Sequence, residues 1–175
     1  MAEEGTPVAA VAEHERTAEL RRLGVSEPLI RLSCGEAVHE MFRNRCLGPP
    51  YYVYHGAGTP DGPPLIALWD CNGTVAGVWK RSDGLEFIDF SIEADDEYRS
   101  LARTEQGFWA TQFDFFYECE VPLTELREAA ATVEFRFLDQ HLAAREAAES
   151  RLGTFEGHRA WLRELVADID RESGA

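Results

Sequence analysis

The chain has 175 residues, which suits one domain or one domain with an appended helical piece. Its 17 basic and 32 acidic residues give a net charge of −15. This balance argues against nucleic acid and against an anionic membrane surface as direct ligands, because both require clustered lysine and arginine. The N-terminus lacks a signal pattern, and no apolar run approaches the length of about 18 residues that a membrane span needs, so we expect a cytoplasmic protein.

The N-terminal third is predicted to contain two helices and one strand. Residues 1–7 are polar, and we expect them to be disordered. Residues 8–23 contain good helix formers that Gly24 ends, and apolar residues at helical spacing predict a second helix over 35–46. The aromatic and β-branched run at 51–54 indicates a short strand.

The next segment carries the pattern of an antiparallel meander. Leu65–Trp69 and Thr74–Lys80 read as strands, and Asn72-Gly73 between them is a strong hairpin signal because a type I′ turn needs a positive φ at both positions. Leu85–Ile92 reads as a third strand. It is apolar on much of both faces, so we expect it to be central in the sheet.

Beyond the meander the sequence becomes acidic and then helical. Residues 93–97 read as an acidic linker, Thr104 can cap a helix with an aromatic stripe, and Thr154 can cap the last helix. Pro122 suits the first turn of a helix between them. Residues 132–137 alternate like a strand but also fit a helical stripe, and we favour a helix because alanine and glutamate dominate the flanks.

Helices, then strands, then helices in this order indicate an α+β fold. We expect an antiparallel β-meander sheet flanked by N-terminal and C-terminal helices. Residues 8–122 should form a single α+β domain. Residues 123–175 should form a C-terminal helical extension packed on the same domain.

The four cysteines, Cys34, Cys46, Cys71 and Cys119, are too far apart in the sequence to form a CxxC pair, so zinc-ribbon and thioredoxin patterns are absent. Four scattered cysteines are also too few for a disulfide framework. We therefore expect reduced, partly buried thiols.

Sequence motifs for catalysis are missing from the chain. It has no GxGxxG after a strand, no P-loop, no HExxH and no GxSxG. Glu36 and His39 could share one face of a helix, but two ligands do not complete a tetrahedral metal site. Cys71 has no base that the sequence places beside it. We therefore expect no catalytic residue, no metal and no cofactor.

Most of the net charge lies in one segment. Residues 85–125 contain eleven acidic and two basic residues, a net charge of −9. Such a segment is either a solvated face or a docking surface for a basic protein. We predict that a basic partner docks on Asp89, Glu93, Asp95, Asp96 and Glu97. Tyr98 and Trp79, if they are exposed, would be the aromatic anchors of this surface.

Several features of residues 64–118 occur in the order strand entry, hairpin, third strand, acidic linker and aromatic helix. They are Pro64-Leu65, Asn72-Gly73, Leu85–Ile92, the linker at 93–97, and Glu105-Gln106-Gly107-Phe108 with Phe113 and Phe116. In this order they resemble the central part of SUKH-superfamily domains, the cell-wall-regulator and bacterial immunity-protein group. The resemblance implies a mixed α+β domain without catalytic activity, of a kind that in bacteria binds and neutralises a cognate toxin.

Charge and resemblance together predict a non-catalytic cytoplasmic binding protein of SUKH type, an immunity-like protein that neutralises a basic partner such as a toxin. Two alternatives stay open. One is a homodimer formed through the C-terminal helices. The other is a small-molecule-binding protein or enzyme with a pocket lined by Tyr51, Tyr52, Tyr54, Trp69, Trp79 and Trp109. The same six aromatic residues could instead simply fill a core.

Overall fold

The computed structural model describes residues 10–174, so the expectation for residues 1–7 lies outside the described part. The chain forms two compact units whose boundary lies between Ser100 and Leu101. The first, here called the sheet unit, contains the sheet and short helices, and the second, the helical unit, is built from helices. The α+β class is therefore confirmed. We expected a boundary after residue 122, so the observed boundary lies earlier in the chain.

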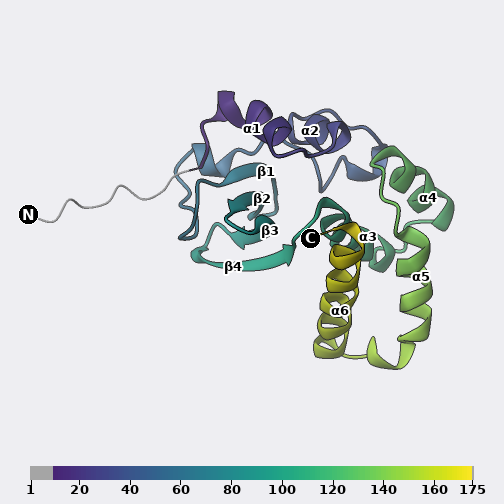
Figure 1. The fold of residues 1–175 in the computed structure, drawn as a ribbon. Coiled ribbons are helices and arrows are strands. Elements are labelled where there is room, and N and C mark those ends of the chain that lie inside the picture. Colours follow the sequence, from purple (N-terminus) through teal and green to yellow (C-terminus); the bar gives the residue numbers. More distant parts are fainter. Residues whose placement is uncertain (1–9, 175) are drawn as a thin grey trace, which may run out of the picture. The chain divides into compact units, whose positions relative to one another are not determined.

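The sheet is a four-stranded meander with the strand order β1-β2-β3-β4 (Figure 1). β1 pairs antiparallel with β2, and β2 pairs antiparallel with β3. The strands are β1 (Ile66–Cys71), β2 (Thr74–Arg81), β3 (Gly84–Ser91) and β4 (Ala94–Ala102). The three expected strands are confirmed. The expected linker at 93–97 is wrong, because most of its residues belong to β4.

The tight turns of the meander use residues that tolerate a positive φ. Between β1 and β2, Asn72 and Gly73 have φ angles of 50° and 77°, as a type I′ hairpin requires. Between β2 and β3, Gly84 has a φ of 137°, which a residue without a Cβ adopts at little cost. These turns set a register in which Val75 pairs with Phe90.

One face of the sheet forms a hydrophobic core, and β3 is one of the two interior strands of the sheet. β3 is buried without interruption from Glu86 to Phe90, so both of its faces are covered, as its apolar pattern predicted. The buried members of the core cluster are Leu65, Ala67, Val75, Trp79, Ile88 and Phe90.

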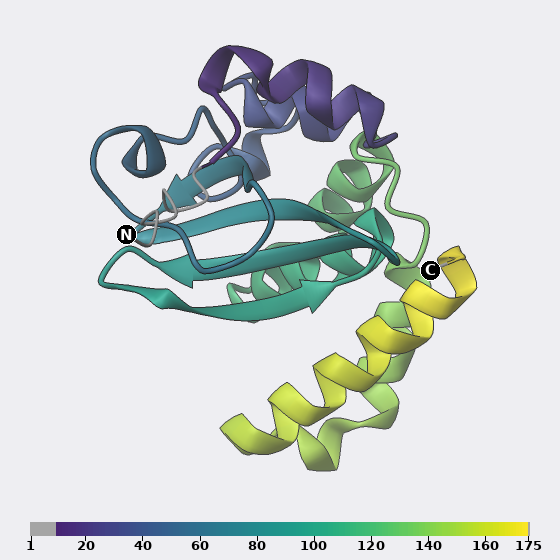
Figure 2. The same cartoon turned by 60° about the vertical axis from the view of Figure 1, so that its left-hand side comes forward.

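The N-terminal helices of the sheet unit are α1 (Arg16–Arg22) and α2 (Glu27–Ser33), and both pack on β1 (Figure 2). α1 begins later than the helix expected over 8–23. It ends before Gly24, whose φ of 75° stops the helix as expected.

Two expected elements of the sheet unit are wrong. The helix expected at 35–46 is reduced to the 3₁₀ turn Glu40–Phe42. The strand expected at 51–54 is a 3₁₀ turn, Tyr52–Tyr54. Its start is held by Asp70, whose Oδ2 accepts hydrogen bonds at 2.6 and 2.9 Å from two consecutive backbone N–H groups of this segment. Side-chain capping has therefore replaced strand pairing there.

The helical unit is a cluster of helices in which α3 contacts each of the other three (Figure 1). The helices are α3 (Glu105–Glu118), α4 (Leu123–Thr132), α5 (Leu138–Ala147) and α6 (Phe155–Ser173). The expected caps are confirmed. Thr104 Oγ1 accepts from Gly107 N at 3.0 Å, and Thr154 Oγ1 accepts from Gly157 N at 3.1 Å.

The ambiguous segment 132–137 is mainly a connection between α4 and α5. α4 ends at Thr132, and α5 begins at Leu138. Glu134 adopts a φ of 57°, and Phe135 N donates to Ala130 O at 2.8 Å, which closes the end of α4. The favoured helix is therefore wrong for most of this segment.

Candidate functional site

The acidic segment predicted from the charge pattern lies on β4, an edge strand of the sheet. Residues from Ala94 to Ser100 are exposed, except for Asp95, which is half-buried. A strand at the edge of a sheet is available for pairing with another chain, and charged side chains on it normally restrain such pairing. The edge position therefore places these carboxylates where a partner can reach them.

Four of the predicted docking residues lie in the first half of β4 and the turn before it, and we call them the acidic edge: Glu93, Asp95, Asp96 and Glu97. Glu93, Asp96 and Glu97 are exposed, and Asp95 lies against the backbone of Gly58. Within residues 10–174 none of the four carboxylates forms an ion pair. Their negative charge is therefore not compensated by neighbouring cations and remains available to attract a basic partner.

Asp89 does not belong to this exposed surface, which corrects its predicted role. It is only 7% exposed, and Arg99 Nε donates to its Oδ1 at 2.8 Å while Arg99 Nη2 bonds to its other oxygen. This bidentate hydrogen bonding raises the pKa of Arg99 above its ordinary value. Asp89 therefore joins β3 to β4 and neutralises a cation of the edge strand.

The two predicted aromatic anchors have different environments. Tyr98 is 41% exposed, but Trp79 is fully buried in the core, so only Tyr98 can contact a partner directly. Their rings meet edge to face with centroids 4.8 Å apart. Arg81 stacks over Trp79 at 4.5 Å and lies 3.5 Å from the Tyr98 hydroxyl. The buried tryptophan therefore supports the exposed tyrosine.

A small depression lies beside the acidic edge. Its volume is about 280 Å³, and its lining includes Glu97, Tyr98 and Arg99 of β4 together with Asp89 and Ser91 of β3. This volume is at the lower limit for small-molecule pockets, which span about 300–1,000 Å³. The depression therefore suits one side chain of a bound protein better than a metabolite.

The aromatic pocket expected under the alternative hypothesis is not assembled. Three of its six residues are buried: Trp69 and Trp79 in the sheet unit and Trp109 in the helical unit. Tyr54 donates its hydroxyl proton to Val11 O at 2.8 Å, and Tyr51 is 56% exposed. These aromatic residues therefore fill cores or lie on the surface.

None of the four cysteines, all of which lie within the described residues, forms a disulfide, but Cys34 and Cys119 are exposed, so the expected burial holds only for Cys46 and Cys71. Cys46 is fully buried, and burial raises the pKa of its thiol well above the ordinary value. Cys71 Sγ donates to Asn44 O at 3.3 Å. In the described part of the chain, no group of three or more His, Cys, Asp or Glu side chains is arranged to hold a metal ion.

The structure also contains a charged cluster that the sequence did not predict. It is centred on Asp114 of α3, which is only 3% exposed. Arg145 of α5 forms ion pairs with both Asp114 and Glu118, and His158 Nε2 of α6 lies 2.8 Å from Asp114 Oδ2, to which it donates. His141 is fully buried, with its Nε2 3.4 Å from Asp114 Oδ1. One carboxylate therefore joins three helices of the helical unit.

The sequence contained one signal for this cluster. Asp114 lies within the aromatic stripe of α3, between Phe113 and Phe116, which are both buried. An ionisable residue within such a stripe needs a buried partner of opposite charge. The sequence does not indicate which residue that is, because Arg145 and His158 are 31 and 44 positions away.

Comparisons of this chain with protein-family models, curated proteins and solved structures found no match. Within residues 10–174 no helix combines the length and the apolar character that crossing a membrane requires. Conclusions about function therefore depend on the acidic edge and on the helical unit themselves.

Proposed function

We propose that this chain is a non-catalytic binding protein that captures a basic protein through the acidic edge. The observation that supports this proposal is the set of uncompensated carboxylates on an exposed edge strand. A surface of one sign accelerates association with a partner of the opposite sign and disfavours wrong partners. The single cation among the exposed residues of β4, Arg99, is already neutralised by Asp89.

The geometry of β4 supports a particular binding mode. An edge strand can accept an extended segment of a partner as an additional strand, with backbone hydrogen bonds for affinity and side-chain pockets for specificity. The neighbouring depression offers Glu97 to a lysine or arginine of that segment, and Tyr98 offers an exposed aromatic face. Charge would set the association rate, and these contacts would hold the complex.

The kind of partner follows from the resemblance to SUKH domains over residues 64–118. We propose an immunity-like role in the bacterial cytoplasm, in which the acidic edge covers a basic surface of a toxin and blocks its action. A basic toxin is the partner that the charge of the edge strand favours.

The test uses the full chain and the purified product of the neighbouring gene, with association followed by stopped-flow fluorescence at low and at physiological salt. The variant carries Glu93→Lys, Asp96→Lys and Glu97→Lys, all at exposed positions. The association rate at low salt should fall by about tenfold or more, because steering of this kind changes rates by factors of about 10 to 1,000. Raising the salt concentration should slow the unmodified protein and leave the variant nearly unchanged.

A matched control reverses the same amount of charge elsewhere, with Glu13→Lys, Glu15→Lys and Glu128→Lys, which are also exposed. We expect this control to bind nearly as fast as the unmodified protein. Equal slowing of both variants would mean that net charge and not the acidic edge drives association. Absence of binding by the unmodified protein would reject the proposed partner.

A further inference from the structure

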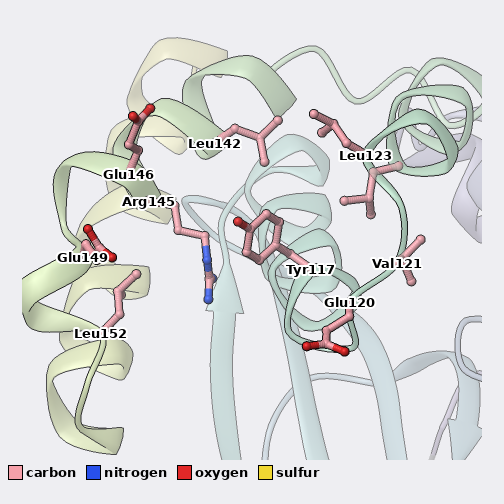
Figure 3. Close-up of a pocket in the computed structure, with 10 residues that line it drawn as sticks. Tyr117, Glu120, Val121, Leu123, Leu142, Arg145, Glu146, Glu149 and Leu152 are labelled. Carbon is pink, nitrogen blue, oxygen red and sulfur yellow. The ribbon is translucent and has the colours of Figure 1, made fainter.

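The helical unit contains a pocket of about 730 Å³, which is the size of pockets that hold drug-sized molecules. It lies between the end of α3 and the start of α4 on one side and the end of α5 and the following turn on the other (Figure 3). Every residue that lines it belongs to the helical unit. It is separate from the acidic edge in sequence and in lining residues.

Six of the ten residues that line this pocket are aliphatic or aromatic, and the other four are charged. Figure 3 shows Leu142 and Leu152 on the side of α5 and the following turn, Leu123 and Val121 on the side of α4, and Tyr117 between the two sides. Leu123 is 47% exposed and Tyr117 is 41% exposed. An apolar body placed here would remove this surface from water, which is the main favourable contribution to binding.

The charged groups around the pocket are mostly negative. Glu120, Glu146 and Glu149 contribute exposed carboxylates, and within residues 10–174 none of them forms an ion pair. The cation in the lining is Arg145, whose guanidinium is paired with two carboxylates of α3 and stacks on Tyr117 at 4.4 Å. Arg145 is therefore compensated, whereas the three glutamates are not.

Helix ends add partial charges to the electrostatic potential of the pocket. α3 ends at Glu118 and α5 ends at Ala147, so two negative helix C-termini lie beside the pocket. α4 begins at Leu123 and contributes one positive N-terminus. Each helix end equals about half an elementary charge, so the three full carboxylate charges determine the sign. The pocket therefore favours cations and repels anions.

We propose that this pocket binds an organic cation with an apolar body, an amine or guanidine attached to an aliphatic or aromatic group. The cationic head lies beside Glu146 and Glu149, on the side of α5 and the following turn, while Glu120 adds negative charge from the opposite side of the pocket (Figure 3). The body packs against Leu123, Leu142 and Tyr117. Neither part alone is sufficient, because exposed carboxylates bind small cations weakly and the apolar walls do not select for charge. This site is independent of the partner that we propose for the acidic edge.

The test is isothermal titration calorimetry of the full chain with four probes: octylammonium, phenylbutylammonium, octanoate and methylammonium. We expect both amphiphilic cations to bind. Octanoate has the wrong charge and methylammonium has no body, so each should bind at least tenfold more weakly. Equal binding of octylammonium and octanoate, or no binding of either amphiphilic cation at millimolar concentration, would overturn the proposal.

Variants locate the site. Glu146→Gln with Glu149→Gln should weaken octylammonium binding by about fivefold to tenfold, as the loss of two partly exposed ion pairs predicts. The control Glu128→Gln with Glu156→Gln removes the same charge at exposed positions outside the pocket and should leave binding unchanged. Amide chemical-shift changes on adding octylammonium should map to the pocket lining. Changes mapping to β4 instead would overturn the proposal.

Discussion

The carboxylates of the acidic edge and of the Asp114 cluster differ in their exposure to solvent and in their pairing with cations. Asp96 and Glu97 are exposed and unpaired, whereas Asp114 is 3% exposed and is bonded to Arg145 and His158. An exposed carboxylate keeps its hydration, so it costs the fold little and remains available to a partner. A buried carboxylate must be compensated inside the protein, so it orders the elements around it instead. Net charge alone does not distinguish these two roles.

Two further aspartates lie between these extremes. Asp89 is buried, but its partner Arg99 has a side chain that is 61% exposed. Asp170 is 6% exposed and bonds to backbone and hydroxyl donors, not to a cation. If burial of the partner sets the energetic role of a carboxylate, removing each of these aspartates should cost stability in a predictable order.

Asp114→Ala should have the largest effect. It leaves the buried guanidinium of Arg145 with Glu118 alone and deprives His158 of its acceptor. Breaking a buried pair from one side costs about 3–5 kcal/mol, so we expect the free energy of unfolding to fall by about 3 kcal/mol, measured by urea unfolding followed by circular dichroism.

The control for this prediction is Asp139→Ala, which removes a carboxylate that is 78% exposed and paired with Arg127. An exposed pair contributes about 0–1 kcal/mol, so the control should stay close to the unmodified protein. If both variants lost the same stability, the cluster would not be energetically distinct from a surface ion pair.

Asp170→Ala should come second. Asp170 of α6 accepts from Arg103 N at 2.8 Å, from Thr104 N at 2.9 Å and from Thr104 Oγ1 at 2.6 Å, and so it fixes the start of α3. Hydrogen bonds to a charged group contribute about 1.5–3 kcal/mol, so we expect a loss of about 2 kcal/mol in urea unfolding. Asp168→Ala removes an exposed carboxylate of the same helix and should cost less than about 0.5 kcal/mol. A smaller loss for Asp170→Ala than for Asp168→Ala would contradict this order.

Asp89→Ala should cost less than either buried change in the helical unit. After the substitution, the exposed guanidinium of Arg99 can turn to water, so no buried cation is left without a partner. We expect a loss of about 1 kcal/mol in the same unfolding experiment. A loss of 3 kcal/mol or more would place this pair with the Asp114 cluster and would remove the distinction between the two regions.

The sequence predicted the parts of the fold that depend on local physics. Asn72 and Gly73 formed the expected hairpin because few residue types accept a positive φ at both positions. Thr104 and Thr154 capped helices as expected because their hydroxyls satisfy orphan backbone N–H groups. Such signals operate within a few residues, so one sequence is sufficient to find them.

The parts that could not be predicted depend on distant contacts. Residues 93–97 have charged side chains that strands disfavour, yet pairing with β3 makes most of them a strand. Tyr52–Tyr54 has strand-forming residues, yet Asp70 holds the segment as a turn. The acidic edge was found because charge can be counted along the sequence. The Asp114 cluster was missed because its partners are distant in the chain.

The smallest effect on stability should come from Asp96→Lys with Glu97→Lys. Both side chains are exposed and unpaired, so reversing them should change the free energy of unfolding by less than about 0.5 kcal/mol per site. Two copies of β4 carry like charges whether the residues are acidic or lysine, so their edges repel each other, and this variant should also keep the sedimentation coefficient of the unmodified protein. Asp96→Val with Glu97→Val should associate as concentration rises, because it removes that protection.

These two variants separate protection of the edge from docking. Protection does not depend on the sign of the charge, whereas attraction of a basic partner does. A lysine variant that stays folded and keeps its sedimentation coefficient but loses the partner would therefore assign docking to the carboxylates themselves. A lysine variant that unfolds or associates would show that the carboxylates of β4 are structural, and the contrast with Asp114 would then fail.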